Sequence, residues 1–175
     1  EKVREMGCLI QGFLCPSLQD EDGLEFDPKH WSTNEDGELV KGILSSGDDV
    51  KRNGRVLDHV ERNGLRLDVM YYDCYSAFWP LCEDFTPSHR VTRRETFEIQ
   101  NAVMAETRQR GIMPGAEVSR FWCIPNCDYF FFSDWSSERL TNVPTKAAPK
   151  PVGIPVPLFQ LVFHDCCAVG FSGGG

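Results

Sequence analysis

The sequence contains two consecutive segments that each read as a helix, a glycine and a strand that ends in a carboxylate. The first ends at Asp73, and its helix stops at Asn63-Gly64; the second ends at Glu117, and its helix stops at Gly111. Helices that alternate with strands favour an α/β fold with a parallel sheet, because parallel strands need a crossover connection. We therefore expect both acids at the same edge of one sheet.

Local patterns set the boundaries of these segments. Asp48 is a residue type that caps a helix, and Thr92 with Glu95 has the spacing of a capping box. Three further stretches are rich in apolar residues and are expected to be strands, and the last of them would end at His164-Asp165. They are residues 6–15, 127–132 and 157–163.

The chain length limits how much of a barrel can be present. A complete (β/α)8 TIM barrel usually needs about 250 residues, whereas this chain has 175. We expect residues 1–175 to form one domain, a partial barrel of four or five strands that is truncated at both ends. The chain begins at Glu1, so the lack of a signal peptide does not indicate a compartment.

Charge and cysteine usage narrow the classes of function. The net charge is −8 and no basic stripe offsets it, which argues against a nucleic-acid partner. No apolar run is long enough for a membrane span. The eight cysteines contain no CxxC pair and lie mostly in apolar stretches, so we expect them to be largely reduced. Cys123, Cys127 and His164 have a spacing that fits no common zinc site, and we expect neither a metal nor a cofactor.

Two carboxylates at neighbouring strand ends suit glycoside hydrolysis. Adjacent strands lie about 4.8 Å apart, which allows carboxyl groups about 5–9 Å apart. The short distance suits a retaining mechanism and the long one an inverting mechanism, and the sequence leaves both open. Structural roles are the alternative: Asp73 could accept loop hydrogen bonds, and Glu117 could pair with Arg120. Asp68 is expected to be structural, because it lies in mid-strand.

Other polar and aromatic residues have both a structural and a binding interpretation. Trp79 and Trp122 lie in the loops after the two acids, where they could be core residues or could stack on sugar rings. Asp20 lies in an acidic run and could simply be solvated, and His164-Asp165 could be a buried hydrogen-bonded pair. The polar segment 31–42 is too long for a plain connector, so we expect it to lie over a site.

Several motifs together resemble the α-N-acetylgalactosaminidase-type glycoside hydrolases, which include the endo-acting mucin-core enzymes and their exo-acting relatives. Residues 71–77 resemble the segment that carries the nucleophile in these enzymes, and residues 115–122 resemble their acid/base segment. Three flanking segments, in the same order along the chain, add to the resemblance. They are residues 17–20, 31–42 and 153–165.

The resemblance implies a catalytic TIM barrel and a retaining mechanism on α-linked sugars, with Asp73 as nucleophile and Glu117 as acid/base. It also implies that Asp20, His164 and Asp165 help to bind a carbohydrate substrate. Gln19 and Glu21 stand where these enzymes have His and Asn. The resemblance therefore implies the reaction more directly than the sugar, which could be an α-N-acetylgalactosaminide of mucin-type glycans or another α-hexoside such as an α-galactoside. A non-catalytic carbohydrate-binding barrel is the alternative from a different class.

The proposed roles place a demand on the acids. Glu117 must hold a proton for the departing oxygen, so its pKa should be raised, whereas Asp73 must be ionised to attack. We expect an apolar wall from Phe121 and Trp122 to raise the pKa of Glu117 by desolvation.

Overall fold

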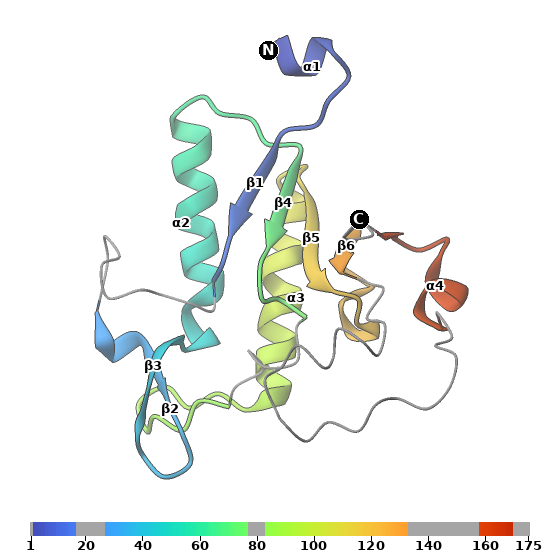
Figure 1. Ribbon diagram of the computed structural model, residues 1–175. Helices are drawn as coiled ribbons and strands as arrows, with labels where there is room; N and C mark the ends of the chain where they lie inside the picture. Colours follow the sequence, from blue (N-terminus) through green and yellow to red (C-terminus); the bar gives the residue numbers. More distant parts are fainter. Residues whose placement is uncertain (1, 17–26, 77–82, 133–157, 170–175) are drawn as a thin grey trace, which may run out of the picture.

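The computed structural model describes residues 2–16, 27–76, 83–132 and 158–169 (Figure 1). Its centre is a five-stranded sheet with the order β1-β4-β5-β6-β7, in which every neighbouring pair is parallel. The described chain is therefore α/β with a parallel sheet, as the sequence predicted. The strands are β1 (Gln11–Leu14), β4 (Val69–Tyr72), β5 (Met113–Val118), β6 (Tyr129–Phe132) and β7 (Ala168–Val169).

The strand order follows the chain order without a reversal. Helix α2 (Asp49–Arg62) connects β1 to β4 after a small hairpin, α3 (Arg93–Gln109) connects β4 to β5, and α4 (Leu158–Phe163) precedes β7. Between β5 and β6 the chain has only the 3-10 turn Phe121–Cys123. Parallel strands in chain order, joined mostly by helices, are typical of a (β/α) barrel, whereas a doubly wound sheet reverses its order. The described sheet is five-stranded and does not by itself amount to a closed barrel.

Glycines follow the ends of the two long helices, and a capping box begins α3. Thr92 and Glu95 form the expected capping box at the start of α3, each side chain accepting from the other's backbone N–H. Asp48 is the N-cap residue of α2, but its side chain makes no capping hydrogen bond. Gly64 and Gly111 follow the helices with φ of +66° and +76°, a backbone conformation that favours glycine.

The main core lies between the sheet and helices α2 and α3. Strand alternation turns Tyr72 of β4 and Phe130 of β6 towards the helices, where both are fully buried. Leu57 of α2 and Val103 of α3 complete the same cluster. Phe159 of α4 packs edge-on against Phe130, with ring centroids 5.5 Å apart. The helices therefore cover one face of the sheet.

The opposite face of the sheet is lined with aromatic rings. Tyr71 of β4 lies centrally, with its ring centroid 5.7 Å from Phe13, 6.3 Å from Tyr129 and 5.7 Å from Phe131. Gly115 of β5 leaves room for this arrangement, because a Cβ there would lie 1.9 Å from the ring of Tyr129. Asp73 and Glu117 continue the same alternation and belong to this face.

The segment after β1 contains a hairpin of β2 (Trp31–Thr33) and β3 (Leu39–Leu44). Figure 1 shows it at the end of the sheet towards which the strand arrows point. Buried Asp84 ties the hairpin to the segment before α3, because Thr33 donates its backbone N–H to the Asp84 carboxylate over 3.1 Å. The expected position of segment 31–42 over a site stays a prediction.

Two strand predictions are corrected. Residues 157–163 were expected to form a strand, but Leu158–Phe163 form helix α4, and the last strand is Ala168–Val169. The stretch is apolar except for Gln160, and a short apolar run does not distinguish a buried strand from a helix by periodicity. The strand expected over residues 6–15 is only Gln11–Leu14, and Met6 and Leu9 before it are exposed. Among the described helices, none is long and apolar enough to cross a membrane.

Candidate active site

Asp73 and Glu117 lie side by side at the carboxyl ends of adjacent strands. Tyr72 of β4 pairs with Ala116 of β5, so Asp73 and Glu117 are the next residues along the two strands. Tyr72 and Ala116 belong to the buried cluster under the helices. Alternation therefore places the two acids on the opposite, aromatic-lined face. The sequence prediction that the two strand ends share one edge of the sheet is confirmed.

The backbone and side chain of Asp73 are both held. Its N–H donates to the Leu14 carbonyl of β1 over 2.9 Å, which fixes the strand end. The Tyr71 hydroxyl donates to Asp73 Oδ1 over 3.3 Å, and the Cys74 thiol lies 3.9 Å from Oδ2. The carboxylate thus has a donor near each oxygen, and these donors orient it.

Glu117 has a different setting from Asp73. Its Oε2 accepts the backbone N–H of Cys74 over 3.0 Å, and its own N–H donates to the Tyr75 carbonyl over 3.2 Å. Burial and the charge of Asp73 raise the pKa of Glu117, and the Cys74 hydrogen bond offsets part of that rise. A raised pKa is what an acid/base carboxyl needs. The described structure shows no ion pair between Glu117 and Arg120, whose guanidinium lies over the Trp122 ring.

The turn after Asp73 has an unusual backbone. Cys74 and Ser76 have φ of 66° and 60°, in the left-handed region that non-glycine residues rarely adopt. Buried neighbours stabilise this conformation. Tyr75 donates to Asp49 Oδ2 over 2.7 Å, and the Ser76 hydroxyl lies within hydrogen-bonding distance of the Val118 carbonyl of β5. Such strain persists where the surroundings impose it, and it is frequent at functional sites.

Tyr71 is a site residue that the sequence alone did not single out. It is buried, yet its hydroxyl reaches Asp73, and burial together with the charges of Asp73 and Glu117 raises its pKa. The signal was present in the sequence, because residues two apart on a strand share a face. A tyrosine two positions before a strand-end carboxylate can therefore donate to it.

Two of the expected substrate-binding residues, Asp20 and Trp79, lie outside the described residues. Trp122 is in a 3-10 turn (Phe121–Cys123) after β5 and stacks on Phe97 of α3, with centroids 4.7 Å apart. This is the packing of a core side chain, and its contact with a sugar stays a prediction.

The placement of His164 and Asp165 is corrected. They were expected at the carboxyl end of a strand, but they lie in the turn between α4 and β7 and are exposed. That turn leads into the amino end of β7, which is parallel to the other strands. The two residues therefore lie at the edge of the sheet opposite to Asp73 and Glu117, because the stretch before them is a helix.

Asp68 has the structural role that was expected, although it precedes β4 and does not lie inside a strand. Its carboxylate accepts from the Ile10 backbone N–H over 2.9 Å and pairs with Arg4 at 3.1 Å. These contacts hold the amino ends of β1 and β4 together.

Six of the cysteines that the structure describes are free: Cys8, Cys74, Cys123, Cys127, Cys166 and Cys167. Cys123 and Cys127 are buried in the core cluster, and Cys127 Sγ lies 3.1 Å from the Tyr129 carbonyl, so neither faces the site. Among the described residues, one group offers three potential metal ligands within 4.8 Å of one another: Cys15, Asp73 and Cys74.

No protein-family model matches the sequence, and no curated protein matches it. Solved structures do match. They are α-N-acetylgalactosaminidase NagBb from Bifidobacterium bifidum, as a quadruple mutant (TM-score 0.81), ligand-free (TM-score 0.80) and in complex with GalNAc (TM-score 0.80).

Each of these matches has 24% sequence identity and covers 94% of this chain. The chain spans only 27–28% of the length of NagBb. The resemblance seen in the motifs is thus confirmed at the level of the fold: the protein is similar to one part of an α-N-acetylgalactosaminidase structure and shares its α/β arrangement around a parallel sheet.

Proposed function

We propose that the protein is a retaining glycoside hydrolase that cleaves α-linked sugars, and that its sheet is part of a (β/α)8 barrel. The observation that carries the proposal is the pair of carboxyls on one face of adjacent strand ends, one of which has a raised pKa. The structural likeness to NagBb supports a glycosidase fold. The order of the motifs along the chain supports the same assignment.

In this mechanism Asp73 attacks the anomeric carbon while Glu117 protonates the departing glycosidic oxygen. A covalent glycosyl–Asp73 intermediate forms, and Glu117 then deprotonates the water that releases the sugar. The two environments support this division of roles. Hydrogen bonding from Tyr71 orients the Asp73 carboxylate, and burial favours the protonated form of Glu117 at the start of the cycle.

We further propose α-N-acetylgalactosaminides, such as those of mucin-type glycans, as the substrates. One NagBb structure is a complex with GalNAc, which supports a related carbohydrate here. Another α-hexoside is the second candidate, because Gln19 and Glu21 differ from the residues expected near the sugar. A panel of nitrophenyl α-glycosides separates the candidates by the ratio of their kcat/KM values.

The retaining mechanism is tested by trapping the intermediate. An activated fluoro-sugar should label Asp73, and peptide mass spectrometry should find the added mass on the peptide that contains it. The matched control is Asp68→Asn, which removes a carboxylate just before the amino end of β4 and should still label. Labelling on another residue, or hydrolysis that persists in Asp73→Ala, would remove Asp73 as the nucleophile. A protein that binds the sugars but neither hydrolyses them nor is labelled would be the non-catalytic alternative.

The role of Glu117 is tested by the pH dependence of kcat/KM. A general acid must be protonated, so activity should fall as the pH rises through its pKa, which lies above the ordinary value for Glu. The variant Glu117→Gln should lose this basic limb and should recover activity on substrates with good leaving groups. An unchanged basic limb would contradict the acid role.

A further inference from the structure

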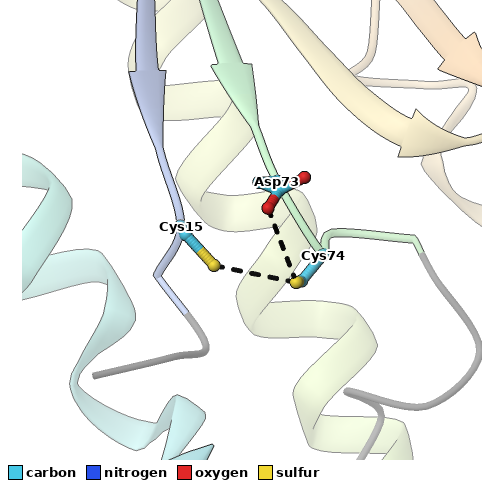
Figure 2. Close-up of side chains that lie close together, drawn as sticks. All are labelled: Cys15, Asp73 and Cys74. Atoms are coloured by element: carbon cyan, nitrogen blue, oxygen red, sulfur yellow. Dashed lines mark hydrogen bonds between the residues drawn. The ribbon is translucent and has the colours of Figure 1, made fainter. Parts of the chain in front are cut away.

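Two thiols and a carboxylate converge beside the candidate nucleophile. Cys15 follows β1, and Asp73 and Cys74 follow β4 (Figure 2). Because Leu14 pairs with Tyr72 in the parallel sheet, Cys15 and Asp73 come next on the two strands. The two Sγ atoms are 3.7 Å apart, and Cys74 Sγ is 3.9 Å from Asp73 Oδ2.

The sulfur spacing fits two ligands of one metal ion. Zinc–sulfur bonds are about 2.3 Å long, so two thiolates at a tetrahedral angle around the ion lie about 3.8 Å apart. The observed 3.7 Å between the Cys15 and Cys74 sulfurs agrees with that value. The Asp73 oxygen would be the third ligand, and all three ligand atoms already lie within 4.8 Å of one another. A fourth position would remain for water or substrate.

The backbone already holds Cys74 in place. Its φ of 66° is strained, and its N–H is committed to Glu117 over 3.0 Å. The residue is only 3% exposed, and Cys15 is half-buried. Little conformational entropy would therefore be lost when the two thiols bind an ion, because the turn is fixed by contacts that do not involve the sulfurs.

We propose that Cys15, Cys74 and Asp73 form a binding site for a thiophilic divalent cation such as Zn²⁺ or Cd²⁺, and that the cation inhibits the enzyme by occupying the carboxylate of Asp73. Two thiols lose their protons to solvent on binding, the sulfurs and the carboxylate donate electron pairs to the ion, and no oxidant is needed. The inhibitory part rests on the proposed function, whereas the binding part does not.

The charges around the site suit a cation. The carboxylates of Asp73 and Glu117 lie close enough to Cys74 for their charges to act on its thiol. These same negative groups attract a divalent ion, which would lower the thiol pKa on binding.

The binding test is a Cd²⁺ titration of the reduced protein, followed by thiolate-to-metal absorbance and by proton release in weak buffer. Wild type should show one tight site with two protons released per ion. Altering residues that merely orient metal ligands costs about 10–100-fold in affinity, so losing a ligand in Cys15→Ser should cost about 100-fold or more. Asp73→Asn should weaken binding while retaining the thiolate absorbance.

The matched control is the double variant Cys166→Ser/Cys167→Ser. It removes two adjacent thiols directly before β7, the edge strand at the opposite end of the sheet from β1. It should retain the tight site. If this control abolishes tight binding, or if Cys15→Ser binds Cd²⁺ as wild type does, the proposed site is wrong. Cys15→Ser is a mild change at a half-buried position, and it keeps the test open if Cys74→Ser fails to fold.

Hydrolysis gives the second measurement. Wild type should lose activity with the same Cd²⁺ dependence as the absorbance, and each variant is compared with itself with and without the ion. Binding at the thiols without inhibition would overturn the inhibitory role and leave the site. An inactive protein that still binds Cd²⁺ through Cys15 and Cys74 would contradict the proposed hydrolase and not the cation site.

Discussion

Gly115→Ala gives the sharpest test of how the aromatic-lined face is built. A methyl group at Gly115 would lie 1.9, 2.3 and 2.4 Å from three atoms of the Tyr129 ring, all well inside contact distance. The Tyr129 ring cannot swing away freely, because its hydroxyl donates to Gln11 Oε1 over 2.8 Å and Tyr71 lies beside it. The variant must therefore shift strand β5 or displace the ring.

The expected loss follows from these two costs. Overpacking by a methyl group costs about 1–3 kcal/mol, and losing the hydrogen bond to Gln11 costs about 1 kcal/mol. We expect Gly115→Ala to lower the free energy of unfolding by about 2–4 kcal/mol, measured by urea denaturation. With an m-value of about 2 kcal/mol/M, the midpoint falls by about 1–2 M.

A double-mutant cycle identifies the cause. Tyr129→Ala removes the ring, so Gly115→Ala should cost far less in that background, and the coupling should be about 1–3 kcal/mol. Tyr129→Phe removes only the hydrogen bond and measures that part separately. If Gly115→Ala is neutral in the wild-type background, or equally harmful without the Tyr129 ring, the close contact is not the reason for a glycine in β5.

Three further predictions concern the carboxyls and their partners. Tyr71→Phe should reduce kcat by about 10–100-fold through loss of a hydrogen bond to a charged group, whereas Tyr72→Phe, away from the site, should spare kcat in the same assay. Asp73→Asn should lower the pKa of Glu117, because the charge of Asp73 is one of the two causes that raise it. A carboxyl-carbon NMR titration measures this pKa, and an unchanged value would show that the charge of Asp73 does not act on Glu117. Burial raises the pKa of Asp49 to about 6 from 3.8, so the folded state keeps a proton that the unfolded state has lost between those values. Stability should therefore fall as the pH rises through that window, and Asp49→Asn should flatten this part of a urea-midpoint profile.

Short sequence patterns predict the ends of the two long helices and the parallel pairing of the strands. The capping box at Thr92 and the glycines after both long helices are short-range signals, and each fixes a boundary whatever the rest of the chain does. Helices that alternate with strands then imply parallel pairing, and parallel pairing brings Asp73 and Glu117 to one edge. The two acids could be paired from sequence because each step depends on only a few neighbouring residues.

The end of the chain shows where that reasoning fails. Residues 157–163 are apolar except for Gln160. Burial of such a short run stabilises a helix and a strand alike, and its pattern does not distinguish the two. Packing decides the outcome: Phe159 lies against Phe130 from the helix layer, and β7 forms only after the turn. His164 and Asp165 consequently lie at the opposite edge from the two acids.

The sequence by itself determined the alternation of helices and strands from α2 to β5, the ends of α2 and α3, and the pairing of Asp73 with Glu117. Tertiary structure alone decided the contacts between residues distant in the chain. It brings Cys15 to Cys74 across 59 positions and sets the Cys74 N–H on Glu117. It also half-buries the Glu117 carboxyl beside the charge of Asp73, and burial and this charge both raise the pKa of Glu117. Desolvation and charge proximity depend on three-dimensional neighbours, and no local pattern encodes them.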